Sequence, residues 1–161
     1  MADRKPASNG EVIAIGTIAA GAGLYFALVG LTLLPPPSRI NGPIWLSLLA
    51  GIAFFSAGIS VIVSGLTGAY DGSGEIPAGT PLWAKIVYWL NSVLAAASLA
   101  AIGTWVAFGS GTRHFSMSGF ISGPVGEGIG RTAFGLGAIL TWLIVLVFAR
   151  EGAKKIFGKK D

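Results

Sequence analysis

The polar side chains that could do chemistry gather in one segment, residues 109–131. This segment holds His114, the hydroxyls of Ser116 and Ser118, and the carboxylate of Glu127. A serine, a histidine and a carboxylate are the components of a hydrolase triad. The segment is rich in glycine, however, and nothing in the sequence holds these three groups in register. We therefore interpret His114 as a solvated or interfacial residue rather than as a catalytic base.

Two further features complete the candidate polar site. Glu127 and Arg131 are four residues apart at the approach to an apolar run, a spacing that predicts an i,i+4 ion pair. Asn91 is the most polar residue inside an apolar run. We expect its amide to hydrogen-bond across helices, with a ligand or ion contact as the alternative. The candidate polar site comprises Asn91, Arg113, His114, Glu127 and Arg131.

The residue inventory excludes several cofactor classes. The chain has no cysteine, which excludes disulfides, thiolate metal sites and iron–sulfur clusters. Its single histidine excludes a bis-histidine haem within one chain. Residues 128–133 match a G-x-G-x-x-A pattern, but a dinucleotide fingerprint needs a preceding strand, and none is expected here. The sequence therefore predicts no catalytic residue, no metal site, no cofactor and no enzymatic activity.

The composition indicates that lipid is the solvent. Of 161 residues, 53% are hydrophobic and only 11% are charged, whereas about 25% are charged in an ordinary soluble domain. The mean hydropathy is +0.73. So few charges cannot coat a soluble globule of this length.

Four apolar runs, at residues 12–34, 44–66, 84–108 and 132–149, account for this hydropathy. Each has about the 17–25 residues that a helix needs to cross the bilayer, and lipid favours helices because it offers no partner to open backbone groups. The first run is too long for a signal peptide, so we expect it to be retained. The predicted fold is all-α: a single transmembrane domain over 1–161, built as a four-helix bundle with its longest loop at 109–131.

The distribution of lysine and arginine predicts the orientation. Eight of these residues lie in the two tails and the second loop, and three lie in the first and third loops. Because basic loops stay on the cytoplasmic side, both termini are expected to be cytoplasmic. The basic C-terminal tail is explained by this topology signal and is compatible with binding to anionic lipid headgroups. It does not predict nucleic-acid binding. The tail residues are Arg150, Lys154, Lys155, Lys159 and Lys160.

Small residues form stripes on the first two runs. On the first run they recur at spacings of 4, 3, 4 and 3, and on the second run three glycines are seven residues apart beside a strip that includes Ala57. Such faces let helix backbones approach closely in lipid. They predict an antiparallel hairpin, with docking of another subunit as the alternative. The selected packing residues are Gly16, Ala20, Gly23, Ala27, Gly30, Gly51, Ala57, Gly58 and Gly65.

Three stretches carry a resemblance to a known group of proteins. They are the segment from Pro35-Pro36-Pro37 to Trp45, the second run with its Gly, Ala and Phe residues, and Gly130-Arg131-Thr132-Ala133-Phe134-Gly135. Together they resemble small uncharacterised inner-membrane proteins of proteobacteria with about four spans. The resemblance implies a location in the bacterial inner membrane, and it carries over no activity and no site residue.

These observations lead to three functional hypotheses. The first is a non-enzymatic inner-membrane protein that acts through helix–helix contacts as an accessory subunit or scaffold. Its partners would be membrane lipid and another membrane protein or a second copy. The second is a small oligomeric transporter or channel. No ionisable residue lies near the centre of any run, which disfavours conventional ion coupling. The third is a membrane enzyme that uses segment 109–131.

Overall fold

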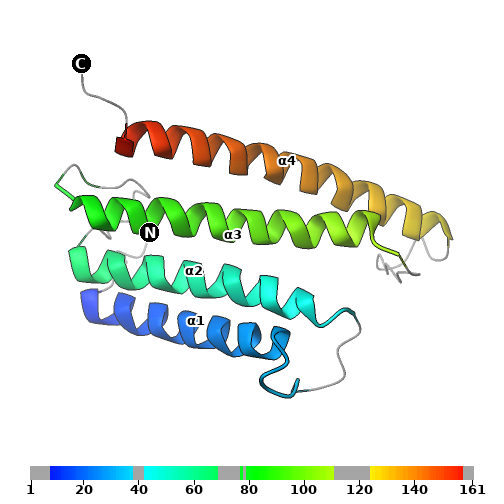
Figure 1. The fold of residues 1–161 in the computed structure, drawn as a ribbon, viewed down its shortest axis with the longest axis horizontal. Helices are drawn as coiled ribbons and strands as arrows, with labels where there is room; N and C mark the ends of the chain where they lie inside the picture. The colour runs from blue at the N-terminus through cyan, green and yellow to red at the C-terminus, as the bar shows by residue number, and fades with distance from the viewer. Residues whose placement is uncertain (1–7, 38–41, 69–76, 78, 111–123, 158–161) are drawn as a thin grey trace, which may run out of the picture.

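Four α-helices make up most of the chain that the computed structural model describes, which is residues 8–37, 42–68, 77, 79–110 and 124–157 (Figure 1). They are α1 (Asn9–Gly30), α2 (Trp45–Thr67), α3 (Leu82–Phe108) and α4 (Pro124–Phe157). All four are long and apolar enough to cross a membrane, which indicates a multi-pass membrane protein. The prediction of an all-α chain with four long apolar helices is therefore confirmed.

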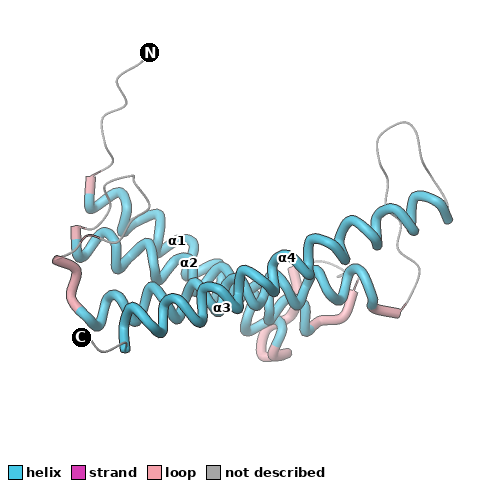
Figure 2. The backbone as a smooth tube through the Cα atoms, turned by 90° about the horizontal axis from the view of Figure 1, so that it is seen from above, coloured by secondary structure: helices cyan, strands magenta, loops and turns pink. Residues whose placement is uncertain are grey.

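The helices lie side by side in chain order, each antiparallel to the next (Figure 1). Among the described residues, α1 contacts α2, α2 contacts α3, and α3 contacts α4, while no other pair of helices touches. The expected bundle is therefore open: α1 and α4 are the two edges of a row and do not close on each other. Figure 2 shows the same row from above. The α1–α2 contact is the most extensive and the α2–α3 contact the least.

The start of α1 explains the position of Glu11. The backbone N–H of Glu11 donates to Ser8 Oγ at 3.3 Å, and the backbone N–H of Ser8 donates to Glu11 Oε2 at 2.7 Å. This reciprocal pair is a capping box, which satisfies two backbone donors at the helix N-terminus. Helix α1 thus begins at Asn9, three residues before the limit that the apolar run indicated, and Glu11 lies in its first turn.

The end of α1 comes before the end of its apolar run. The N–H of Thr32 donates to Val29 O at 2.9 Å, and the N–H of Leu33 donates to Leu28 O at 2.9 Å. These two bonds form a Schellman motif, in which the residue after the C-cap takes a left-handed conformation. Thr32 has this conformation, with φ of 60°. A β-branched residue is strained there, and the three prolines that follow prevent the helix from resuming.

Helix α4 is much longer than its apolar run. It has 34 residues, about 51 Å at 1.5 Å per residue, against about 30 Å of hydrocarbon. It extends in both directions, through residues 124–131 of the expected loop and through 150–157 of the tail. At the end of the row away from α1's start, α3 and α4 project beyond α1 and α2 (Figure 1).

Candidate functional site

Helices α1 and α2 meet backbone to backbone along a line of glycines. A Cβ added to Gly16 would lie 2.8 Å from Ile62 N and 2.9 Å from Gly58 O, closer than real Cβ atoms approach other groups. A Cβ at Gly23 would overlap the backbone of Phe55. Glycine is therefore required at these positions by the close approach of the two helices, as in small-residue interfaces in lipid.

The facing strip on α2 uses glycine in the same way. A Cβ at Gly51 would overlap the backbone of Ala27, and one at Gly58 would overlap that of Ala20. We call this contact the glycine seam. The residues of the predicted packing set that lie in it are Gly16, Ala20, Gly23, Ala27, Gly30, Gly51, Gly58 and Gly65.

One residue of the predicted set, Ala57, lies outside the glycine seam. Its side chain is exposed, although the neighbouring Gly58 is buried. Successive helical residues are rotated by about 100°, so two adjacent strips cannot both face α1. The strip of Gly51, Gly58 and Gly65 faces α1 instead, because glycine lets the two backbones come closest.

Helices α3 and α4 are joined instead by hydrogen bonds that tryptophan side chains donate. Trp89 Nε1 donates to the backbone oxygen of Phe148 at 3.0 Å, and its ring lies against Gly152, where any Cβ would overlap it. Trp142 Nε1 donates to Thr104 Oγ1 at 3.1 Å. Sequence reasoning did not find these contacts. The one sequence feature that accompanies them is Gly152, which leaves space for the ring of Trp89. Recognising this pair requires the register between α3 and α4, which the sequence does not give.

Arg131 ties the other end of α4 to α3. Its Nε donates to Glu127 Oε1 at 3.0 Å, and Nη2 lies 3.0 Å from the same oxygen, which confirms the expected i,i+4 ion pair. Nη1 also donates to Ala107 O at 3.3 Å and to Gly109 O at 3.1 Å. The last carbonyls of a helix have no partner within the helix and carry its partial negative charge. Arg131 therefore caps the C-terminus of α3, and the pair with Glu127 orients it.

The α2–α3 contact, which we call the central seam, is formed by hydroxyl and aromatic side chains. At one end the hydroxyls of Thr67 and Tyr88 are 3.5 Å apart. At the other, the rings of Trp45 and Trp105 pack edge to face with centroids 5.9 Å apart. Asn91 lies on α3 between these ends, and its Nδ2 is buried without a hydrogen-bond partner in the described part of the chain.

The candidate polar site does not form one cluster. Arg113 and His114 lie outside the described residues. Glu127 and Arg131 meet at the C-terminal end of α3, whereas Asn91 is 16 residues before Ala107, about 24 Å along the helix. The described residues hold no group of three His, Asp or Glu side chains that could bind a metal ion. What the structure brings together is a structural cap and, separately, a buried amide.

The basic tail continues α4 rather than leaving the helix. Arg150 and Lys154 are exposed on its last turns, and Lys154 Nζ lies 3.2 Å from Glu151 Oε1. The side chain of Lys155 is outside the described set, as are Lys159 and Lys160. The two described basic residues thus lie exposed near the C-terminal end of α4, next to its apolar span.

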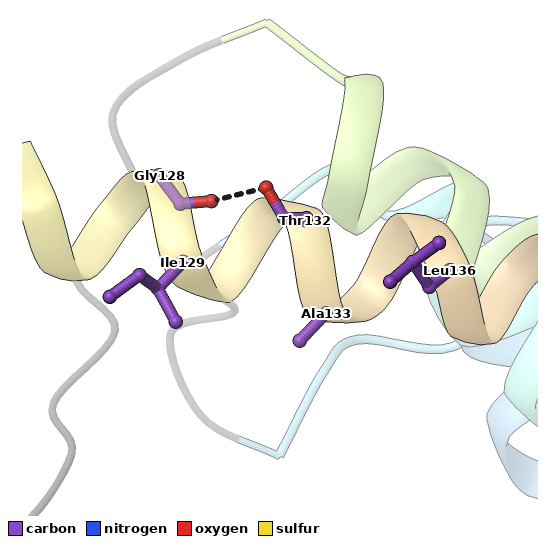
Figure 3. Close-up of a pocket in the computed structure, with 5 residues that line it drawn as sticks. All are labelled: Gly128, Ile129, Thr132, Ala133 and Leu136. Carbon is purple, nitrogen blue, oxygen red and sulfur yellow. Dashed lines mark hydrogen bonds between the residues drawn. The ribbon is translucent and has the colours of Figure 1, made fainter.

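Two shallow hollows lie along α4. The one between α3 and α4 has a volume of about 440 Å³. The other is near the start of α4, where Thr132 Oγ1 donates to Gly128 O at 2.9 Å (Figure 3). Both linings are apolar apart from threonine hydroxyls, which suits an apolar side chain or an acyl chain. The first is lined by Leu99, Ile102, Gly103, Ala133, Phe134, Gly137, Ala138 and Thr141, and the second by Gly128, Ile129, Thr132, Ala133 and Leu136.

Comparisons with known proteins found no match for this chain among protein-family models, curated proteins or solved structures. The functional argument below is therefore built on the contacts of the chain's own residues.

Proposed function

We propose that this protein is a non-enzymatic integral protein of the bacterial inner membrane that acts through helix–helix contacts, as an accessory subunit or scaffold. The observation that carries the proposal is the uncovered face of α4. This helix contacts α3 and no other described helix, so its opposite side is open along the whole span. A partner helix, from another membrane protein or a second copy, would pack on that side.

The residues on the uncovered face support this role. Ala133 and Gly137 are exposed at the edge of this face, beside the hollow between α3 and α4, and a Cβ at Gly137 would meet nothing within 4 Å. Small residues are what lets helices associate in lipid, where apolar burial alone gives no driving force. In the same chain, glycines at the α1–α2 contact bring two helices into backbone contact. On α4, Ala133 and Gly137 offer a partner helix a similar small-residue contact, beside exposed large apolar side chains such as Leu136 and Leu140.

We further propose that both termini are cytoplasmic. Four antiparallel helices bring the start of α1 and the end of α4 to the same end of the row. That end also carries Lys85, Arg150 and Lys154, whereas Arg131 lies at the opposite end. Since basic residues stay on the cytoplasmic side, this distribution supports the proposed orientation.

The proposal is tested by purifying the protein from its native membranes in a mild detergent or in lipid nanodiscs. We expect the wild type to carry a stoichiometric partner or to be a dimer by native mass spectrometry. Gly137→Leu should reduce this association about tenfold, which corresponds to about 1.4 kcal/mol of contact energy.

The matched control is Gly21→Leu, which adds the same side chain to an exposed glycine on the other edge helix, again with nothing within 4 Å of its Cβ. This variant should keep the association. A wild-type protein that is monomeric and without a partner in native membranes would refute the proposal.

A further inference from the structure

Asn91 presents an unexplained donor within the helix row. The Nδ2 atom of Asn91 is shielded from solvent and has no hydrogen-bond partner among the residues that the structure describes. Burying an amide without a partner is unfavourable, and it is more so in a bilayer, where lipid supplies none. An amide N–H that is retained in such a place requires an acceptor.

The position of Asn91 on α3 shows where the acceptor must lie. At about 3.6 residues per turn, Asn91 is close to a whole number of turns from both Tyr88 and Trp105. Those two residues contact Thr67 and Trp45, both on α2. Asn91 therefore lies on the face of α3 that is turned toward α2, in the central seam.

The central seam carries hydroxyls from both helices. Ser98 follows Asn91 by seven residues, near two full turns, and is 4% exposed. On α2, Ser56 is 2% exposed, and both Ser56 and Ser60 are near whole turns from Thr67. Asn91, Ser98, Ser56 and Ser60 thus share the one face-to-face contact between α2 and α3.

The register places one of these hydroxyls at the level of Asn91. In an antiparallel pair, three residues on from Tyr88 corresponds to three back from Thr67, at residue 64. Counting from the other anchor, fourteen residues back from Trp105 corresponds to fourteen on from Trp45, at residue 59. Ser60 falls within this interval and on the required face of α2.

We propose that Asn91 binds a buried water molecule in the central seam, and that this water bridges its amide to the hydroxyl of Ser60. Buried waters typically satisfy polar groups that lack a protein partner and make about three hydrogen bonds. The occupant is neutral because α2 has no charged residue, and Lys85, the one charged residue of α3, lies on a different face. The site is in the least extensive helix contact of the row.

The composition of the chain makes this site accessible to NMR. The protein has three asparagines and no glutamine, so a ¹⁵N spectrum contains three side-chain carboxamide NH₂ signals. Asn9→Ser and Asn41→Ser assign the Asn91 signal by elimination and leave the seam intact. Magnetisation transfer from water is then measured in washed bilayers by solid-state NMR.

We expect the Asn91 amide to receive magnetisation from water, and Ser60→Ala to reduce that transfer at least threefold. Ser92→Ala, which removes an exposed hydroxyl on another face of α3, should leave it unchanged. Absence of transfer from water to Asn91, or transfer that Ser60→Ala does not alter, would overturn the proposal. The outcome does not depend on a partner protein, so it is separate from the test of the proposed function.

Discussion

Among single residues, Arg131 makes two kinds of contact, and only one of them can be predicted from a sequence pattern. Its pair with Glu127 joins neighbours on one helix, whereas its hydrogen bonds to Ala107 and Gly109 carbonyls join two helices. The first contact is local and common on helix surfaces. The second satisfies carbonyls at the C-terminal end of α3 and joins that end to the early turns of α4.

Replacing Arg131 should therefore cost more than replacing its ion-pair partner. Arg131→Gln leaves two carbonyls at the C-terminus of α3 without their donor, and we expect it to lower the free energy of unfolding by about 1 kcal/mol. This is below the ~1.5–3 kcal/mol of buried charged hydrogen bonds because the side chain is 29% exposed. Glu127→Gln keeps the cap and should cost less than half as much. Denaturant unfolding in mixed micelles measures both, and equal losses would contradict the capping role.

At the scale of the helices, three successive contacts are held by three different means. The glycine seam joins α1 to α2 by backbone proximity, the central seam joins α2 to α3 through aromatic and hydroxyl groups, and tryptophan and arginine tethers join α3 to α4. The glycine seam has no room for a side chain. It is therefore the contact most sensitive to added volume.

Substitutions at two adjacent positions of α2 distinguish the effect of filling the glycine seam from the effect of adding a leucine to the helix. Gly58→Leu forces a side chain into the backbone of α1, and we expect a loss of about 3 kcal/mol, at the upper end of the usual cost of overpacking. Ala57→Leu adds a similar side chain at an exposed position and should change stability by less than about 0.5 kcal/mol. Thermal unfolding in one detergent compares the two variants. Similar melting temperatures for the two variants would contradict the tight packing of the glycine seam.

At the scale of the whole molecule, the open row determines which surfaces remain available. In a closed bundle every helix would have at least two neighbours, whereas among the described helices α1 and α4 each have one. The uncovered face of α4 is for this reason the surface on which the proposed function depends. The row also separates its basic residues, with Arg150 and Lys154 at one end and Arg131 at the other.

The orientation can be measured with single cysteines because the chain has none of its own. Ser110→Cys and Glu151→Cys introduce thiols at exposed positions on opposite ends of the row. If both termini are cytoplasmic, a membrane-impermeant maleimide labels Ser110→Cys in intact cells. It labels Glu151→Cys only after permeabilisation. The reverse pattern would show that the basic end faces outward.

Features that depend on neighbours in the chain can be predicted from the sequence alone. Four apolar runs indicated four helices, the 4-3-4-3 spacing on the first run selected the face that α1 turns to α2, and Glu127 with Arg131 formed the expected pair. These predictions succeed because helix formation, periodicity and i,i+4 contacts are local. A local pattern does not identify the partner of each face.

The partner of each helix face and the register between helices follow only from the three-dimensional packing. Packing of one backbone on another selected the strip of Gly51 and Gly58 over that of Ala57, and the contacts of Arg131 and Trp89 joined residues far apart in the chain. The length of α4 and the open row likewise depend on which helices meet. These features escape sequence reasoning because many registers satisfy the same periodicity. Only the fit of particular surfaces in three dimensions distinguishes them.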